Sequence, residues 1–167
     1  MNYIYWPEGY LPGTTDHYAS NEIIIAGLTA EQIWPYISNT SEWPKYYSNA
    51  SDLHFYNGPG PELFEGARFR FTTFGLIVEA EVTEYVPPAN GEPARVAWHG
   101  WCEGSEDKKL NVHHAWLFEN LSGGRVRILT QESQIGKPAK DMAVQKPNPM
   151  INAHQEWIEG LAKAATK

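Results

Sequence analysis

The middle of the chain consists of short stretches in which apolar and polar residues alternate. In Arg68–Thr72, Phe69 and Phe71 fall on one face and the two arginines on the other, the two-residue period of a half-buried β-strand. Ser122-Gly123-Gly124 predicts a tight hairpin. Apolar runs, alternation and flanking turn residues predict six further strands: His17–Ala26, Leu53–Tyr56, Leu76–Val86, Arg95–Cys102, Asn111–Asn120 and Arg125–Ile135.

Two short helices are expected after the first strand. Thr29 can cap a helix, with Gln32 at the third position of a capping box. An apolar stripe follows at helical spacing, formed by Ile33, Trp34 and Ile37. Ser41 can cap a second short turn around Trp43-Pro44, and we expect Trp43 to lie in the core.

The chain ends in a segment with helical rather than strand periodicity. Asn148 is a suitable N-cap, and Pro149 fits the first helical position. The apolar face of this segment is formed by Met150, His154, Trp157, Ile158, Leu161 and Ala165. The spacing predicts a terminal helix of about four to five turns.

The order of these elements predicts an α+β domain. Consecutive strands joined by short loops form an antiparallel meander, and a single amphipathic helix can be buried against the concave face of such a sheet. We therefore expect a curved antiparallel sheet of about six to seven strands wrapped around the long C-terminal helix. Residues 1–17 are predicted to be a turn-rich extension and residues 18–167 a single domain. A cavity remains wherever the helix does not fill the curve.

Composition and charge narrow the classes of function. The 167 residues carry a net charge of −7, which disfavours nucleic acid and anionic membranes as partners. No apolar run reaches the ~18 residues of a membrane span, so no membrane insertion is expected. The lone Cys102 and an N-terminus without a basic start and apolar stretch favour a cytoplasmic protein without a secretory signal.

Several short segments, in this order, carry a family resemblance: Ala30–Trp34, Glu42–Pro44, Val82–Pro87, Gly123–Val126, Gln131–Ser133 and the closing Trp157-Ile158. Their order and spacing resemble the START/Bet v 1-like (SRPBCC) superfamily, and within it the polyketide cyclase/dehydrase-like bacterial proteins. The resemblance covers roughly residues 18 to 166 and implies the helix-grip fold. It also implies the range of roles in that superfamily, which includes lipid carriers, hormone-binding proteins and aromatase/cyclases. The N-terminal extension lies outside the resemblance and could cap the pocket, cover a sheet edge or stay mobile.

Strand alternation predicts which side chains line the cavity. A three-residue hairpin loop is expected to pair Phe118 with Val126, so that His114 lies opposite Thr130. A symmetric turn before this strand is expected to place Trp98 opposite Trp116. Arg125 and Arg127 are expected to face solvent. With two helix residues, the predicted ligand-binding set is Phe69, Phe71, Val82, Trp98, His114, Trp116, Phe118, Ile128, Thr130, Glu132, Met150 and His154.

One corner of this apolar wall is polar. His114 and Glu132 are expected to be neighbours, and His154 could reach them from the terminal helix. A carboxylate beside an imidazole in an apolar pocket can act as acid and base, so these three residues are the catalytic candidates. The alternative is that His114 and Glu132 only satisfy each other's hydrogen bonds.

A metal site is considered for His99, Cys102, His113 and His114, which lie close together in the sequence. Adjacent strand residues point to opposite faces, so no face gathers three of these ligands. We therefore expect no metal and no cofactor. Cys102 is expected to be a buried thiol rather than a nucleophile.

The leading hypothesis is a non-catalytic protein that binds a small hydrophobic or aromatic molecule, such as a lipid, polyketide or isoprenoid-like compound. The alternative is a cyclase/aromatase-type enzyme that uses the same cavity. A third class is an interaction module whose sheet binds another protein. Trp101 and Leu117 are expected to share the outer face of the sheet, where an exposed apolar pair would favour a homodimer.

Overall fold

A computed structural model describes residues 1–167. The strands are β1 (His17–Ala26), β2 (Ser51–Phe55), β3 (Arg68–Thr73), β4 (Leu76–Val86), β5 (Ala94–Cys102), β6 (Leu110–Leu121) and β7 (Arg125–Ile135). The helices are α1 (Ala30–Ser38), the 3-10 helix η1 (Thr40–Glu42), α2 (Trp43–Tyr46), α3 (Lys137–Ala143) and α4 (Pro149–Ala165).

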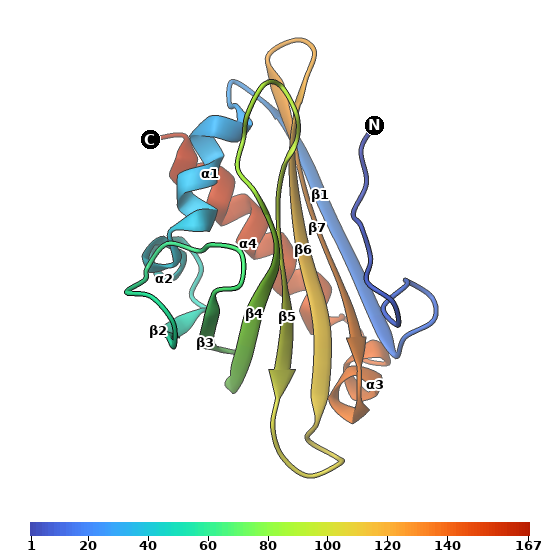
Figure 1. The fold of residues 1–167 in the computed structure, drawn as a ribbon. Helices are drawn as coiled ribbons and strands as arrows, with labels where there is room; N and C mark the ends of the chain where they lie inside the picture. Colours follow the sequence, from blue (N-terminus) through green and yellow to red (C-terminus); the bar gives the residue numbers. More distant parts are fainter.

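All seven strands form one antiparallel sheet in the order β1-β7-β6-β5-β4-β3-β2. The sheet curves around α4, while α1 and α2 lie on the same side (Figure 1). The predicted helix-grip architecture is therefore confirmed. None of the helices is long and apolar enough to cross a membrane.

The first helical region begins with the predicted cap. The backbone N–H of Gln32 donates to Thr29 Oγ1, and the Gln32 side chain accepts from the backbone N–H of Thr29. The second cap is Asn39 rather than Ser41, because Asn39 Oδ1 accepts the backbone N–H of Ser41 at 3.0 Å. Trp43 is buried as predicted, and its indole N–H donates to the carbonyl of Ile37.

Helix α4 begins with the predicted N-cap. Asn148 Oδ1 accepts the backbone N–H groups of Met150 and Ile151. Near its other end α4 passes so close to α2 that a Cβ at Gly160 would lie 2.5 Å from the carbonyl oxygen of Tyr46. Gly160 therefore sets how closely the helix approaches α2.

Four tryptophans from four different elements meet on the concave face. Trp43 stacks on Trp98 with ring centroids 5.4 Å apart, and Trp157 of α4 lies 5.2 Å from Trp43 and 5.1 Å from Trp116. All four are at most 2% exposed. Their rings fill the space between α4 and the centre of the sheet, where a cavity was expected.

The register of two strand pairs differs from the prediction by two residues. Phe118 pairs with Ile128 rather than Val126, and His114 pairs with Glu132 rather than Thr130. The hairpin loop is residues 122–124 as predicted, and a three-residue loop at this position pairs Leu121 with Arg125 and therefore Phe118 with Ile128. The predicted register is thus inconsistent with the predicted loop. In the neighbouring pair, Trp98 lies opposite His114 rather than Trp116. A shift of two residues keeps each side chain on its predicted face.

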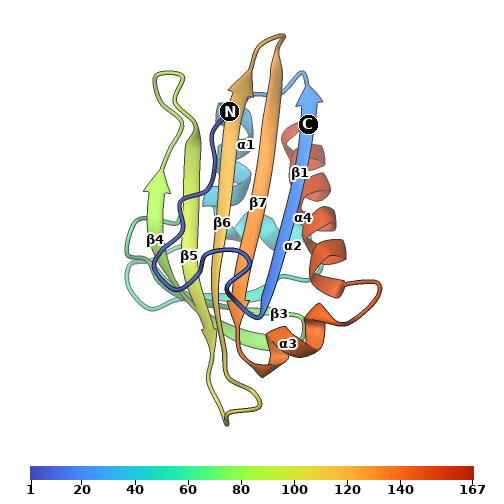
Figure 2. The ribbon, with the colours of Figure 1, turned by 90° about the vertical axis from the view of Figure 1, so that its right-hand side faces the viewer.

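The N-terminal extension neither caps the pocket nor covers an edge of the sheet. It runs over the face of the sheet opposite α4, across β5, β6 and β7 (Figure 2). Ile4 is 4% exposed and packs with an outer-face cluster of Ala97, Ala115, Leu117 and Leu129. The guanidinium of Arg95 donates to the carbonyl of Tyr3 and lies 3.9 Å from the centre of the Tyr5 ring.

Two predictions for the outer face are wrong for the same reason. Arg127 does not face solvent but is 7% exposed, donating to the carbonyl of Asn2 and pairing with Glu22 and Glu119. Leu117 is fully buried under the extension, so it forms no exposed apolar pair with Trp101.

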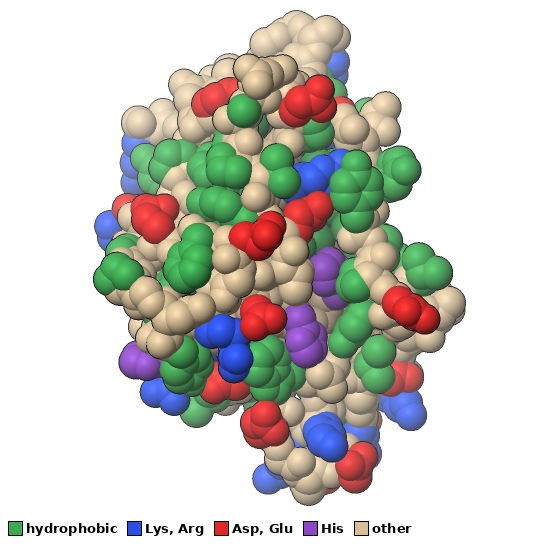
Figure 3. Space-filling view, viewed as in Figure 1, with side chains coloured by type: hydrophobic (Ala, Val, Ile, Leu, Met, Phe, Trp, Pro, Cys, Tyr) green, Lys and Arg blue, Asp and Glu red, His purple; other side chains and the backbone are tan.

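On the face seen in Figure 3, acidic and basic side chains lie interspersed among hydrophobic ones.

We expect Ile4→Ala to lower the free energy of unfolding by about 2–4 kcal/mol, because it empties a buried site on the outer face. Leu11→Ala is the matched control, since Leu11 is in the same extension but 57% exposed, and it should change stability by less than about 0.5 kcal/mol. Denaturant unfolding measures both. Equal effects would contradict the docking of the extension on the sheet.

Gly160→Ala tests the contact between α4 and α2. Within an exposed helix this change stabilises by about 1 kcal/mol, but here the added methyl group meets the Tyr46 carbonyl. Thermal unfolding should therefore show a lower melting temperature for the variant. A higher melting temperature would contradict the packing.

Candidate functional site

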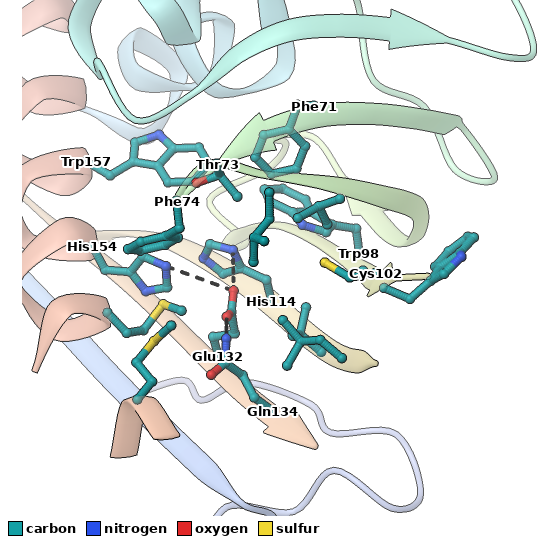
Figure 4. Close-up of a pocket in the computed structure, with 18 residues that line it drawn as sticks. Phe71, Thr73, Phe74, Trp98, Cys102, His114, Glu132, Gln134, His154 and Trp157 are labelled. Atoms are coloured by element: carbon teal, nitrogen blue, oxygen red, sulfur yellow. Dashed lines mark hydrogen bonds and ion pairs between the residues drawn. The ribbon is translucent and has the colours of Figure 1, made fainter. Parts of the chain in front are cut away.

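A pocket lies at the end of the sheet next to the β5–β6 loop, between the β3–β4 hairpin, α3 and the start of α4 (Figure 4). Its cavity volume is about 50 Å³, and 12 of its 18 lining residues are hydrophobic. Its apolar wall includes Phe71, Trp98 and Trp157, and its polar groups include His114, Glu132, Gln134 and His154. The pocket is thus far smaller than the expected hollow, because the tryptophans occupy most of the curve.

Half of the predicted ligand-binding residues line this pocket: Phe71, Trp98, His114, Glu132, Met150 and His154. The other half are at most 2% exposed and lie outside the pocket, in the core: Phe69, Val82, Trp116, Phe118, Ile128 and Thr130. The prediction identified the inward-facing residues, but half of them lie in the filled core rather than along this cavity.

Several lining residues were missed although the sequence carried a signal for them. Gly100 and Cys102 continue the inward period from Trp98, Val112 continues it from His114, and Gln134 continues it from Glu132. Others come from segments without a regular pattern, such as Phe74 of the β3–β4 turn and Met142 of α3. Alternation gives no information about such residues.

The polar floor of the pocket is a buried carboxylate between two histidines. Glu132 Oε1 lies 3.0 Å from His114 Nδ1 and 3.9 Å from His154 Nε2. The two imidazoles stack with centroids 4.6 Å apart and an interplanar angle of 14°. The three side chains are 3–7% exposed. The structure therefore brings the three catalytic candidates together (Figure 4).

Glu132 is held by hydrogen bonds that lead back to the cap of α4. Because Asn148 Oδ1 accepts from the helix N-terminus, its amide Nδ2 donates to His17 Nε2 at 2.9 Å. His17 Nδ1 then donates to Gln134 Oε1 at 2.8 Å, and the amide nitrogen of Gln134 donates to Glu132 Oε2. Strands β1 and β7 and helix α4 thus fix one oxygen of the carboxylate.

Thr130 determines which hydrogens His114 carries. The Thr130 hydroxyl donates to the carbonyl of Ala115 at 3.0 Å and lies 2.8 Å from His114 Nε2. A hydroxyl has one hydrogen, so both contacts are satisfied only if Nε2 of His114 carries a hydrogen. The remaining nitrogen, Nδ1, faces Glu132. A proton or another cation must then lie between Nδ1 and the ionised carboxylate to avoid a contact between lone pairs.

The charges of Glu132 and His154 follow from their surroundings. Burial alone would raise the pKa of Glu132, but the charge of His114 and its hydrogen bond outweigh burial and lower the pKa. Burial, and then the charge of His114, lower the pKa of His154 to about 3. The floor of the pocket near neutral pH therefore consists of an ionised Glu132 and a neutral His154. Burial also raises the pKa of the Cys102 thiol, which lines the same pocket and remains protonated.

The histidines and cysteine considered for a metal site do not come together. His113 lies on the outer face against Trp6 and Tyr10 of the extension, and His99 stacks on Trp101. A different set does come together, because ligand atoms of His114, Glu132 and His154 all lie within 4.8 Å of one another.

No family model and no curated protein sequence matches the chain. Its structure is similar to that of the hypothetical protein jhp0584 from Helicobacter pylori, with 45% sequence identity, a TM-score of 0.94, and coverage of 99% of this chain and 97% of that chain. The chain belongs to the family of jhp0584.

Two more distant structures show the fold alone. Norcoclaurine synthase from Thalictrum flavum, solved in complex with dopamine and hydroxybenzaldehyde, is 12% identical with a TM-score of 0.62, over 99% of this chain and 96% of that chain. The di-domain ARO/CYC BexL from the BE-7585A biosynthetic pathway is 12% identical with a TM-score of 0.57, over 87% of this chain and 44% of that chain. The family of jhp0584 thus has a Bet v 1-like fold.

The two buried neutral histidines predict how stability depends on pH. Burial lowers the pKa of His113 to about 4 and that of His154 to about 3, both from 6.5. As the pH falls from about 6.5 to 4, the unfolded chain takes up protons that the folded chain does not, so the free energy of unfolding decreases. His113→Phe should remove about 2 kcal/mol of this decrease at pH 5. Denaturant titrations at pH 7.5 and pH 5 measure the difference, and an unchanged pH dependence would contradict the assigned charges.

Proposed function

We propose that this protein binds a small molecule that has an apolar ring or chain and one hydrogen-bonding group. The observation that carries the proposal is His154 Nδ1, a buried nitrogen without a hydrogen-bond partner in a side chain that lines the pocket. An unpaired buried polar atom costs about 1–3 kcal/mol. A ligand group that donates a hydrogen bond, such as a hydroxyl, would recover that free energy.

The rest of the pocket suits the apolar part of such a molecule. Phe71, Trp98 and Trp157 offer aromatic surface, and Met150 at the start of α4 adapts to different shapes. The fold supports the proposal in general terms, since norcoclaurine synthase shares it and was solved with small phenolic and amine compounds. The proposal places the present chain among small-molecule-binding members of the fold.

The size of the pocket limits the ligand and requires movement. A cavity of about 150 Å³ holds benzene, whereas this pocket has about 50 Å³. A ring can therefore enter only if the mouth opens. Phe74 lines the pocket in a turn and has a positive φ of 52°, and two of the lining residues are the flexible Met142 and Met150. These side chains are the ones that we expect to shift.

Phenol and benzene, as a matched pair of probes, test this proposal by ligand-observed NMR on chelator-treated protein. We expect phenol to bind about tenfold more tightly than benzene, which corresponds to one hydrogen bond of about 1.4 kcal/mol. His154→Phe keeps a ring in the stack but removes the acceptor, so it should abolish the difference between the probes.

His113→Phe is the control for that experiment, because His113 is also buried but packs on the opposite face of the sheet. It should leave both affinities unchanged. The proposal is wrong if neither probe binds the wild-type protein, or if the two variants behave alike.

Acid–base conversion of the bound molecule, as in a cyclase or aromatase, is a second candidate. It is favoured by the contact between His114 and Glu132 within an apolar pocket. For any compound that the protein converts, Glu132→Gln should lower turnover by about 100-fold or more while binding is retained. Recovery of carried compounds unchanged after prolonged incubation would argue for binding alone.

A further inference from the structure

We propose that His114, Glu132 and His154 together bind a divalent transition-metal ion, with Zn²⁺ as the best-matched ion. The site uses the pocket of the proposed function, but it does not depend on an organic ligand. The two proposals can therefore fail separately.

The type of donor selects the class of metal. Two imidazole nitrogens and one carboxylate oxygen lie within 4.8 Å of one another, and a set of two histidines and one glutamate is a known catalytic zinc arrangement. Mg²⁺ and Ca²⁺ prefer sets made of oxygen atoms. A nitrogen-rich set in an apolar pocket therefore favours Zn²⁺ and related ions of the first transition row.

In two of the three donors, the atom that points away from the proposed metal position already has a hydrogen-bond partner. His114 Nε2 is hydrogen bonded to the Thr130 hydroxyl, and Glu132 Oε2 is hydrogen bonded to Gln134. Such contacts orient metal ligands and leave the other lone pair free for the ion. The inner atoms, His114 Nδ1 and Glu132 Oε1, face each other at 3.0 Å.

The contact between His114 Nδ1 and Glu132 Oε1, at 3.0 Å, has the length of a hydrogen bond, so a proton lies between these atoms when no metal is bound. With a hydrogen on Nε2 of His114, the space between Nδ1 and the carboxylate must contain a proton or a metal ion. The metal would take the place of that proton, which leaves to solvent as the ion binds. Once that proton has left, His114 is neutral with its hydrogen on Nε2, and Glu132 is ionised.

His154 is the donor that must move. Its Nε2 lies 3.9 Å from Glu132 Oε1, and its ring is stacked on His114 with centroids 4.6 Å apart. Bonds of about 2.0–2.2 Å to zinc lie close to the plane of each ring, so the imidazole of His154 must turn out of the stack. Because Nδ1 of His154 has no hydrogen-bond partner, rotating the ring breaks no hydrogen bond at that nitrogen. The adjoining cavity of about 50 Å³ leaves room for water on the ion.

Untagged full-length protein, stripped with a chelator and dialysed, provides the test without any organic ligand. Co²⁺ is titrated by visible absorption and Zn²⁺ by calorimetry. We expect one ion per chain, and Mg²⁺ should bind at least 100-fold more weakly. Wild-type protein without a Co²⁺ spectrum and without Zn²⁺ heat would overturn the proposal.

Glu132→Gln removes the carboxylate donor and should weaken Zn²⁺ binding by more than 100-fold. His99→Gln is the control, because His99 contacts Asn111 and Trp101 rather than the pocket floor, and it should bind as the wild type does. Equal affinity of Glu132→Gln and wild type, or loss of binding in His99→Gln, would show that the ion binds elsewhere.

Thr130→Val keeps the test decisive if Glu132→Gln does not fold. This change preserves all three donors and removes only the hydroxyl that holds His114 Nε2. Zn²⁺ affinity should fall by about 10- to 100-fold, as for other outer contacts of metal ligands. A folded Thr130→Val protein with unchanged affinity would contradict the proposed role of His114.

Discussion

The centre of the concave face is filled by four tryptophans that contact one another, and this packing decides where a cavity remains on that face. Trp43 comes from α2, Trp98 and Trp116 from neighbouring strands, and Trp157 from α4. Large aromatic side chains contribute much of the burial that holds elements together. Because they fix α4 against the middle of the sheet, free space remains at the end near the β5–β6 loop. The pocket is therefore the part of the concave face that the tryptophan side chains leave unfilled.

Glu132 places a charge at the inner end of that remaining space. A carboxylate that is 6% exposed is tolerated only when hydrogen bonds and an opposite charge compensate for lost hydration. A chain of hydrogen bonds connects Glu132 through Gln134 and His17 to Asn148, which also caps α4. The polar floor and the start of the helix that carries His154 are thus positioned by one set of contacts. The proposed ligand would contact Nδ1 of His154, and the proposed metal ion would bind Glu132 Oε1 together with the two histidines.

The sequence predicted the strands, the caps of α1 and α4 and the helix-grip arrangement because these depend on local periodicity and capping chemistry. It also placed His114, Glu132 and His154 together, since errors of two residues in register preserve the face of a strand. It failed where tertiary packing decides. Alternation could not show which part of the concave face the tryptophans fill. The buried Ile4 of the extension was missed because its neighbours in sequence show no hydrophobic period. The set proposed to bind a metal was not considered from the sequence, because candidates were grouped by closeness in sequence, as with His99 and His113, rather than across elements.

The two contacts of the Thr130 hydroxyl place a hydrogen on Nε2 of His114, so that Nδ1 faces the carboxylate of Glu132 across a proton. Nitrogen-15 NMR of the imidazole side chains in metal-free, ligand-free protein near neutral pH tests it most directly, because the nitrogen shifts report which ring atoms carry hydrogens. We expect a hydrogen on Nε2 of His114 and a neutral His154 ring. A neutral His114 with its only hydrogen on Nδ1, and Nε2 accepting from Thr130, would contradict this expectation.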